Sequence, residues 1–355
     1  MWFLRRPAPP EELVSGLVSA TLELTSTRYA RFQTRLAGVD KTSLEIANRS
    51  TTVVATHLQE LGLILIGDAE SDPDESRGAL VAAAAATQPD FAAGLVSCLD
   101  LLPLEQRKSA AHVFANLVNR TDTTEFATVI AKSPIIISSL TNAYKDETAD
   151  LALIRGMMLR EAARHEIVAK SLLEAPNFWL FFFTASKQLQ LKSFEVTADA
   201  FELLKVLLMG HGVLAARFIQ NNYAAFVCHF NLLLQSNNYV TCRESIRLLG
   251  ELLLLRENFS IMMSYISDRE NLKILMNLLR CKRKRIQIEA FHLFKVVFVA
   301  NPRKPVDITL ILVKNRDKLV TYLRNFHNDK DADAQFAEEK ALVVETLLSL
   351  DAIER

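Results

Sequence analysis

The hydrophobic positions of this chain recur at an interval of 45 residues. One column of the repeat holds large apolar residues at every step: Phe114, Leu159, Leu204, Leu249 and Phe294. A neighbouring column is also apolar: Val113, Met158, Leu203, Leu248 and Leu293. A further column is small at four of five steps: Ala110, Arg155, Ala200, Ser245 and Ala290. Leucine-rich helices can share a register by chance, but the column of small residues favours a true repeat.

A period of about 40–47 residues built from two or three helices is typical of armadillo and HEAT repeats. In such arrays each unit buries its apolar face against its neighbours. We therefore predict an all-α, armadillo- or HEAT-like helical-repeat solenoid. Such a solenoid is expected to be a right-handed superhelix with a concave partner-binding face. The clearest 45-residue units run from about residue 105 to 325.

The repeat also predicts the domain organisation. Residues 1–10 are expected to be a flexible arm, with the first helix starting near Pro10, where Glu11 and Glu12 suit a first turn. Residues 11–350 are expected to form a single armadillo-like domain. Residues 326–355 are expected to be a C-terminal cap and tail, because the last helix carries polar residues on one side, as a terminal repeat requires.

The segment from Tyr239 to Asn325 is the most basic part of the chain. It holds 17 Lys plus Arg against 8 Asp plus Glu, although the whole chain has a formal net charge of zero. Its first helix is apolar on most faces, yet Arg243 and Arg247 lie four residues apart and so share one stripe. This pattern predicts a buried helix that presents a basic stripe to an acidic partner. A merely solvated face is the alternative for any single cation.

Three aromatic residues near these cations point to the same surface. Phe194, Tyr239 and Phe259 lie near helix ends, and aromatic residues with arginines are the usual anchors of protein interfaces. Each aromatic alone could equally pack in the core. Together with the arginines they predict an exposed binding face. The run Arg280–Arg285 is interpreted as a solvated turn or, alternatively, as a patch for an acidic ligand or for nuclear import.

The sequence offers no residues for catalysis or for a metal site. The only histidine beside a cysteine is His229 after Cys228, and adjacent helical residues point about 100° apart. The acidic run that starts at Asp68 lacks the glycine and glutamate of an EF-hand loop, having Pro73 and Ala79 at those places. No phosphate-binding glycine motif occurs. We therefore expect no enzyme activity, no cofactor and no metal.

The remaining composition bears on the compartment. The four cysteines are scattered singly, which favours a reducing, intracellular setting. No apolar run is long enough for a membrane helix, and the N-terminus lacks the apolar core of a signal peptide. A cytoplasmic protein is expected, with a nuclear fraction as the open alternative.

Several phrases of the sequence closely resemble the calcium-binding protein 39 family, the mouse-protein-25-like helical-repeat adaptors of Ste20-type kinases. The resemblance is strong from about residue 149 to 345, fair from 100 to 148, and weak before that. The phrases that carry it are Leu159-Arg160-Glu161, Leu248-Leu249-Gly250-Glu251-Leu252, Met276-Asn277-Leu278-Leu279-Arg280, Glu289-Ala290-Phe291-His292 and Val299-Ala300-Asn301-Pro302.

The resemblance implies a non-catalytic scaffold in cell polarity and morphogenesis signalling. In this family the concave face binds a Ste20-type kinase or pseudokinase and stabilises its active-like conformation, alone or in a ternary complex. Carried over residue by residue, the concave contacts are Phe194, Tyr239, Arg243, Arg247, Arg256 and Phe259. Arg247 departs from the lysine that is usual in the family, which keeps the charge but changes the geometry.

The resemblance also implies a separate C-terminal pocket for a Trp-Glu-Phe peptide from the partner. Its residues in this chain are Lys273, Met276 and Lys314. One extra residue within Val296–Val299 shifts the register before Lys314.

Two other binding classes are compatible with a helical-repeat fold. A generic armadillo-class interaction or transport adaptor, not linked to kinases, is the main alternative. A transport receptor for basic signals needs an acidic, tryptophan-lined groove, whereas this chain has only Trp2 and Trp179. Nucleic-acid binding is not expected of a neutral chain. A monomer is expected, because the concave face is reserved for the partner.

Overall fold

The computed structural model describes residues 8–34, 41–120, 122–144, 148–175, 178, 194–327 and 334–350. Within these ranges the chain forms helices and turns and no strand, so the predicted all-α class is confirmed. The contacts divide the chain into two compact units, Met1–His211 and Gly212–Arg355. The prediction of a single armadillo-like domain over 11–350 stays a prediction.

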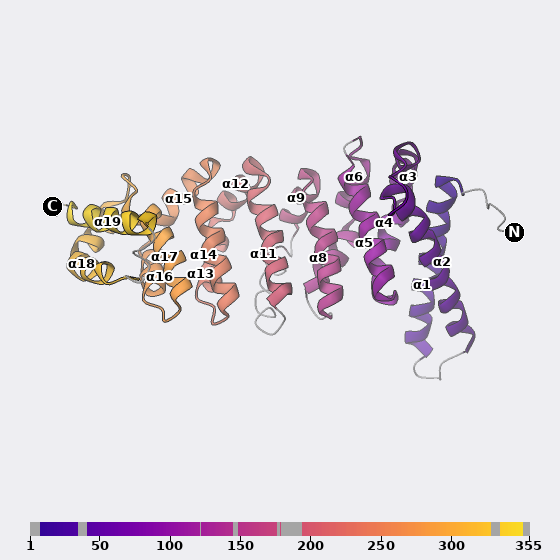
Figure 1. The fold of residues 1–355 in the computed structure, drawn as a ribbon, viewed down its shortest axis with the longest axis horizontal. Helices are drawn as coiled ribbons and strands as arrows, with labels where there is room; N and C mark the ends of the chain where they lie inside the picture. The colour runs from indigo at the N-terminus through magenta and orange to yellow at the C-terminus, as the bar shows by residue number, and fades with distance from the viewer. Residues whose placement is uncertain are drawn as a thin grey trace. The chain divides into compact units, whose positions relative to one another are not determined.

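The described residues of the N-terminal unit form a succession of helices (Figure 1). They are α1 Pro10–Thr34, α2 Lys41–Leu65, α3 Glu75–Thr87, α4 Pro89–Ser97, η1 Leu99–Leu101, α5 Leu104–Asn119, α6 Glu125–Lys132, α7 Pro134–Thr141, η2 Asn142–Tyr144, α8 Ala149–Ala163, α9 Glu166–Leu173 and α11 Phe194–Met209. α1 begins where the sequence predicts a helix start, and residues 1–7 of the predicted arm lie outside the described ranges.

The C-terminal unit continues the same pattern. Its helices are α12 Gly212–Asn221, α13 Tyr223–Leu234, α14 Tyr239–Leu253, η3 Arg256–Asn258, α15 Phe259–Ile266, α16 Arg269–Leu279, α17 Lys284–Leu293, η4 Phe294–Val299, α18 Val306–Arg324 and α19 Ala334–Leu348. Residues 328–333 and 351–355 of the predicted cap and tail lie outside the described ranges.

The predicted repeat is confirmed within each unit. The helices α5, α8, α11, α14 and α17 begin at Leu104, Ala149, Phe194, Tyr239 and Lys284, each 45 residues after the one before. α5 lies beside α8 and α8 beside α11, and in the other unit α14 lies beside α17 (Figure 1). Every member of the three columns given above is buried. The superhelix with a concave face concerns both units together and stays a prediction.

The one break in the column of small residues has a local explanation. Arg155 takes the place of the small residue on α8, yet its side chain is only 9% exposed. Its guanidinium lies 4.0 Å from the carboxylate of Asp100, which belongs to η1, the short helix before α5. A buried arginine is tolerated when a carboxylate compensates its charge.

Side-chain caps define where the helices near the candidate sites begin. Asn238 accepts hydrogen bonds from the backbone N–H groups of Val240 (2.9 Å) and Thr241 (3.2 Å), and so starts α14. Asp268 accepts one from the N–H of Glu270 at 2.9 Å and starts α16. These caps satisfy donors that a helix N-terminus leaves without partners.

α17 continues directly into a π-helical segment, η4, which spans Phe294–Val299. The N–H of Ala300 bonds the carbonyl of Lys295 at 2.8 Å, a step of five residues rather than four. A π-turn therefore holds one residue more than an α-turn. The segment includes Val296–Val299, where the family resemblance implies one extra residue. A π-turn would accommodate such a residue without a break in the helix, and the extra residue itself stays a prediction.

A buried polar cluster joins α8 to α11 in the N-terminal unit. The hydroxyl of Tyr144 donates a 2.5 Å hydrogen bond to Asp199, and Arg160 forms an ion pair with the same carboxylate. Burial, and then the charge of Asp199, raises the pKa of Tyr144 well above its ordinary value. The phenol therefore stays protonated and donates at neutral pH. Gly156 makes room for the cluster, since a methyl there would overlap Asp199 and lie 2.5 Å from the Tyr144 oxygen.

We expect Gly156→Ala to destabilise the N-terminal unit by about 1–3 kcal/mol, because the methyl overpacks a buried ion pair. Gly62→Ala is the matched control, since no atom lies within 4 Å of a Cβ at Gly62 in α2. It should stabilise the protein by about 0.5–1 kcal/mol through helix propensity. Thermal unfolding followed by circular dichroism measures both. Equal melting temperatures for the two variants would contradict this role of Gly156.

Candidate functional site

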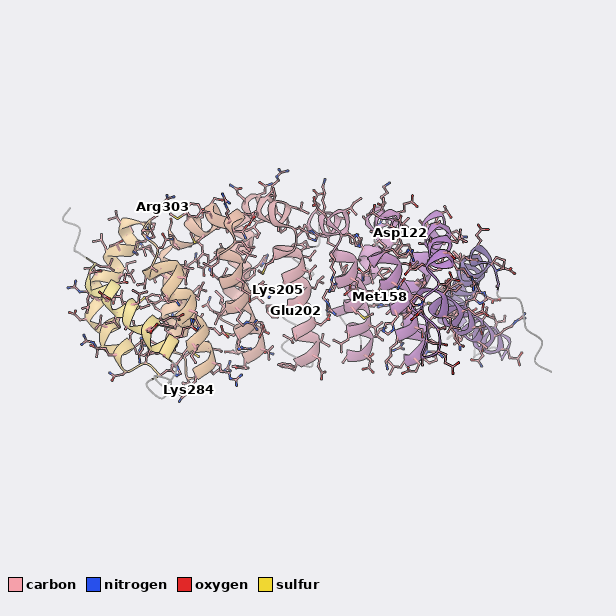
Figure 2. The ribbon with its side chains drawn as sticks, turned by 45° about the horizontal axis from the view of Figure 1, so that its top comes forward. Asp122, Met158, Glu202, Lys205, Lys284 and Arg303 are labelled. Carbon is pink, nitrogen blue, oxygen red and sulfur yellow. The ribbon has the colours of Figure 1, made fainter. Side chains whose placement is uncertain are left out.

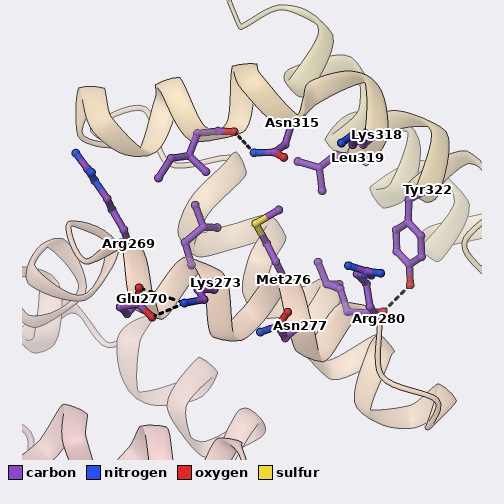
Figure 3. Close-up of a pocket in the computed structure, with 13 residues that line it drawn as sticks. Arg269, Glu270, Lys273, Met276, Asn277, Arg280, Asn315, Lys318, Leu319 and Tyr322 are labelled. Carbon is purple, nitrogen blue, oxygen red and sulfur yellow. Dashed lines mark hydrogen bonds and ion pairs between the residues drawn. The ribbon is translucent and has the colours of Figure 1, made fainter.

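One candidate site of the C-terminal unit is a pocket of about 700 Å³ between α16 and α18. Its floor is apolar, and polar side chains surround the rim (Figure 3). The apolar lining residues are Leu272, Met276, Leu279, Ile311 and Leu319. The hydroxyl of Tyr322 donates to the carbonyl of Leu279 at 2.5 Å and ties the end of α18 to the end of α16. The pocket is thus an apolar recess between two fixed helices.

The rim of this pocket is basic. Four cations line it, Arg269, Lys273, Arg280 and Lys318, against a single carboxylate, Glu270. Lys273 pairs with Glu270 at 3.1 Å and Arg269 pairs with Asp307 at 2.5 Å. Arg280 and Lys318 are exposed, and neither forms an ion pair within the described part of the chain. The pocket therefore favours a ligand that combines apolar groups with negative charge.

Two of the three residues that the family resemblance assigns to a peptide pocket line this recess. They are Lys273 and Met276, both on α16. Lys314, the third, is exposed on α18 but is not among the lining residues. Lys318 lies one helical turn further along and takes the position at the rim. Sequence reasoning missed Lys318, although its four-residue spacing from Lys314 was a usable signal.

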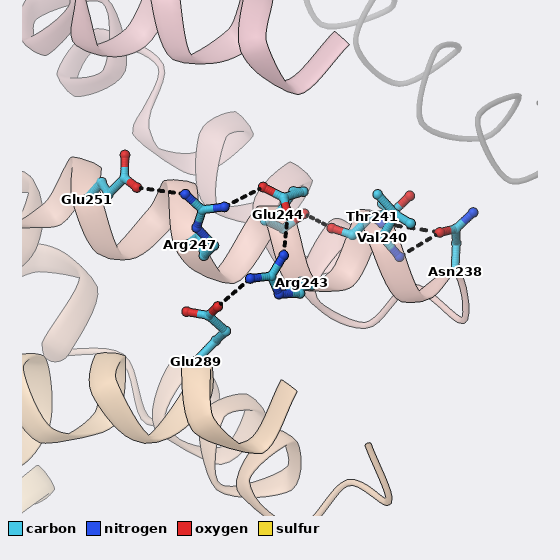
Figure 4. Close-up of polar contacts among 9 residues, drawn as sticks. Asn238, Val240, Thr241, Arg243, Glu244, Arg247, Glu251 and Glu289 are labelled. Carbon is cyan, nitrogen blue, oxygen red and sulfur yellow. Dashed lines mark hydrogen bonds and ion pairs between the residues drawn. The ribbon is translucent and has the colours of Figure 1, made fainter. Parts of the chain in front are cut away.

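The predicted basic stripe on α14 is interleaved with carboxylates (Figure 4). Arg243 contacts Glu244 at 3.0 Å and reaches Glu289 of α17 at 3.1 Å. Arg247 contacts Glu244 at 3.3 Å and Glu251 at 3.6 Å. Each guanidinium thus has two carboxylate neighbours within the unit. The stripe is an ion-pair network rather than a row of unpaired cations.

The predicted aromatic contacts are on the surface. Phe194 is 67% exposed, Phe259 44% and Tyr239 37%. Arg283 lies 5.9 Å from the ring centre of Tyr239, and Arg303 lies 5.5 Å from that of Phe259. Guanidinium groups at such distances are attracted to the face of the ring.

The six predicted contacts are divided between the two units. Tyr239, Arg243 and Arg247 follow one another at four-residue steps and share one stripe of α14. Arg256, which is exposed, and Phe259 come just after this helix. Phe194 belongs to the N-terminal unit, where it begins α11. The structure therefore brings three of the six together on one helix.

The residues of the basic run Arg280–Arg285 lie in different surroundings. Arg280 lines the α16–α18 pocket. Arg283 donates to the carbonyl of Asn237 at 2.9 Å and lies over Tyr239, so it braces the turn before α14. Lys284 begins α17, and Figure 2 shows it at the opposite end of the C-terminal unit's helices from Arg303. These contacts indicate that Arg283 has a local structural role.

The described residues contain no group of three or more His, Cys, Asp or Glu side chains that could hold a metal ion. Burial raises the pKa of Cys98 to about 12 and that of Cys242 to about 11. Both thiols are therefore protonated and poor nucleophiles at neutral pH. Among the same residues no single helix is long and apolar enough to span a membrane. Only the pair Glu75–Thr87 and Pro89–Leu101, which is bent by 90°, is long and apolar enough when its two helices are taken together.

Comparison with known proteins identifies the family. The family model described as Mo25-like matches residues 1–351. The human protein named calcium-binding protein 39-like is 40% identical over 309 residues, which cover 85% of this chain and 88% of that protein. The Mo25-like protein of Schizosaccharomyces pombe is 39% identical over 311 residues, covering 86% and 92%. MO25-like protein 2 of Caenorhabditis elegans is 45% identical over 258 residues, covering 72% and 74%.

The family match spans both units. The three relatives are 39–45% identical to this chain over most of their own length. The resemblance seen in the sequence phrases is thereby confirmed. The chain belongs to the Mo25-like family of scaffold proteins.

Proposed function

We propose that this chain is a non-catalytic scaffold for a Ste20-type protein kinase or pseudokinase. It binds the kinase domain in an active-like conformation and captures a Trp-Glu-Phe-type peptide from the C-terminal tail of the partner. The observation that carries the proposal is the pocket between α16 and α18, an apolar recess with four cations and one carboxylate at its rim. Membership of a scaffold family supports it.

The chemistry of such a peptide fits this pocket. Two aromatic side chains need apolar depth, which Leu272, Met276 and Leu319 supply. Met276 suits a ring because its thioether side chain is flexible and polarizable. The glutamate of the peptide needs a cation, and Arg280 and Lys318 are the exposed rim cations without an ion pair among the described residues. The volume of about 700 Å³ lies within the usual range for pockets that bury a ligand, roughly 300–1,000 Å³.

The kinase domain is proposed to bind the stripe of α14 together with Arg256, Phe259 and Phe194. Because Arg243 and Arg247 already have carboxylate neighbours, a partner's carboxylate must compete with Glu244 and Glu289. The arginines therefore contribute orientation and specificity more than affinity. The exposed rings of Phe259 and Tyr239 supply the apolar contact area.

Activation of the partner would follow from differential affinity. A scaffold that binds the active-like conformation more tightly than the inactive one raises the population of the former. No chemistry by the scaffold is needed. We place this action in cytoplasmic signalling that controls cell polarity, with the scaffold itself a monomer.

A fluorescent peptide that ends in Trp-Glu-Phe should bind the purified protein saturably, as measured by fluorescence polarization. Met276→Ala should weaken binding about tenfold or more, because the ring loses its apolar contact surface. Met262→Ala is the matched control, since Met262 is half-buried on α15 outside the pocket. Saturable binding that is unchanged by Met276→Ala would place the peptide elsewhere. No binding at all would favour an adaptor that is not linked to kinases.

Arg243→Ala should weaken binding of a Ste20-type kinase domain about threefold, because it removes a charge that orients the partner while Glu244 and Glu289 remain at the surface. Its fold should be retained, since ion pairs that remain partly exposed contribute at most about 1 kcal/mol. Arg324→Ala, an exposed arginine at the end of α18, is the control and should bind normally. Calorimetry measures the affinity and a circular-dichroism melt the fold. Unfolding of the Arg243→Ala variant would contradict the surface assignment.

A further inference from the structure

Arg256 and Phe259 share one side of the turn that follows α14. The N–H of Phe259 bonds the carbonyl of Arg256, and side chains three residues apart in such a 3₁₀ turn lie on the same side. The amide of the buried Asn258 donates to the carbonyl of Leu252 at 2.9 Å and holds the turn against the end of α14. Arg256 is exposed, and so is much of the ring of Phe259. The turn therefore presents a guanidinium and a ring side by side to solvent.

A third side chain, Arg303, joins this pair from the loop between η4 and α18. Its guanidinium lies 5.5 Å from the ring centre of Phe259. The side chain of Asn301 accepts a hydrogen bond from the N–H of Arg303 at 2.9 Å, and prolines on both sides restrict the backbone of the loop. Arg303 is exposed, and Figure 2 shows it at one end of the helices of the C-terminal unit. We call these three residues the η3 cluster: Arg256, Phe259 and Arg303.

The η3 cluster has an excess of positive charge. Neither of its guanidinium groups forms an ion pair within the described part of the chain. Asp307, four residues after Arg303, pairs with Arg269 instead. Glu257 is the one carboxylate beside the cluster in sequence, and its Cγ would lie 3.9 Å from a Cβ at Gly212, so it lies next to the start of α12. Two unpaired guanidinium groups thus stand against a single nearby carboxylate.

The η3 cluster differs in this respect from the stripe of α14. Each guanidinium of that stripe has two carboxylate neighbours, so a partner's carboxylate must compete with them. At the η3 cluster an incoming carboxylate has no such competitor and gains a charge-assisted hydrogen bond. The ring of Phe259 also attracts the guanidinium of Arg303, which reduces the entropy lost when a partner fixes that side chain. The cluster is therefore the better of the two places for an acidic group.

We propose that Arg303 is a further contact for the kinase domain and binds a carboxylate of that domain, with Arg256 adding to the local positive potential. An apolar side chain next to this carboxylate lies against the exposed part of the Phe259 ring. The inference rests on the proposed function, since the partner is the kinase domain that binds the stripe of α14. Arg303 directly follows the phrase Val299–Pro302 and is not among the contacts that the family resemblance implies. The group it recognises is an aspartate or glutamate beside an apolar residue.

Calorimetry with purified Ste20-type kinase and pseudokinase domains tests the contact. Arg303→Ala should weaken binding about fivefold and Arg303→Glu more than about twentyfold, because the partner's carboxylate first loses its neighbour and then meets a like charge. The melting temperature should stay the same, as expected for an exposed side chain without an ion pair. Arg324→Glu, at an exposed arginine at the end of α18, is the matched control and should bind like wild type. Equal binding by wild type and Arg303→Glu would overturn the inference and leave the proposed function intact.

Two further measurements separate a direct contact from a role in holding the ring. The double variant Phe259→Ala/Arg303→Ala should bind about fivefold more weakly than Phe259→Ala alone. Equal binding by these two variants would mean that Arg303 acts only through the ring, and would overturn the carboxylate contact. Raising the salt concentration from about 0.05 to 0.3 M should weaken binding of wild type more than that of Arg303→Ala, because exposed charges are screened. An equal effect of salt on both would also count against the contact.

The same binding assay identifies the acidic group and separates this inference from the proposed function. Kinase domain treated with a phosphatase should bind as tightly as before, whereas a loss of binding would indicate a phosphate and overturn the carboxylate. The Trp-Glu-Phe peptide should bind every variant equally, since neither Phe259 nor Arg303 lines the α16–α18 pocket. Wild type that binds the peptide but no kinase domain would overturn both the kinase-domain contact of the proposed function and the role of Arg303.

Discussion

Burial of one apolar stripe per helix against the matching helix of the next repeat is the constraint on which this structure depends. Leu249 and Phe294 are fully buried where α14 packs on α17, and Phe114 and Leu159 are buried likewise in the other unit. A repeat helix of this kind cannot bury its stripe alone. The packing leaves the opposite stripe of each helix free to differ. On α14 that stripe carries Tyr239, Arg243 and Arg247.

The repeat could be predicted from the sequence because burial allows only a few residue types at each position of a column. The starts of α5, α8, α11, α14 and α17 follow the predicted interval, and Arg155 was the only member that departed from its column. Arg155 can be buried because Asp100 compensates its charge. Asp100 lies outside the three columns, so the columns alone could not predict this pairing. The π-turn of η4 was not predicted, because the pattern of apolar positions does not say where a helix widens to five-residue hydrogen bonding.

The candidate sites could be predicted in part. Lys273 and Met276 line the α16–α18 pocket, whereas Lys318 rather than Lys314 reaches its rim. Which of two lysines one turn apart faces a pocket depends on the rotation of α18, which the sequence pattern leaves open. The charge of the α14 stripe was the least predictable feature. A count over the segment gave an excess of cations, but the contacts pair Arg243 with a glutamate 46 residues away. Charge complementarity is decided by such contacts rather than by regional totals.

The π-turn of η4 has a consequence for how length can vary in proteins of this kind. Insertions in helical proteins are usually tolerated in surface loops, because a loop does not fix the packing of its neighbours. Here the segment Phe294–Val299 is wound as a π-helix, and Phe294, Val297 and Phe298 within it are buried in the core. Because a π-turn holds one residue more than an α-turn, a helical repeat has room to change length by one residue inside its core rather than in a loop.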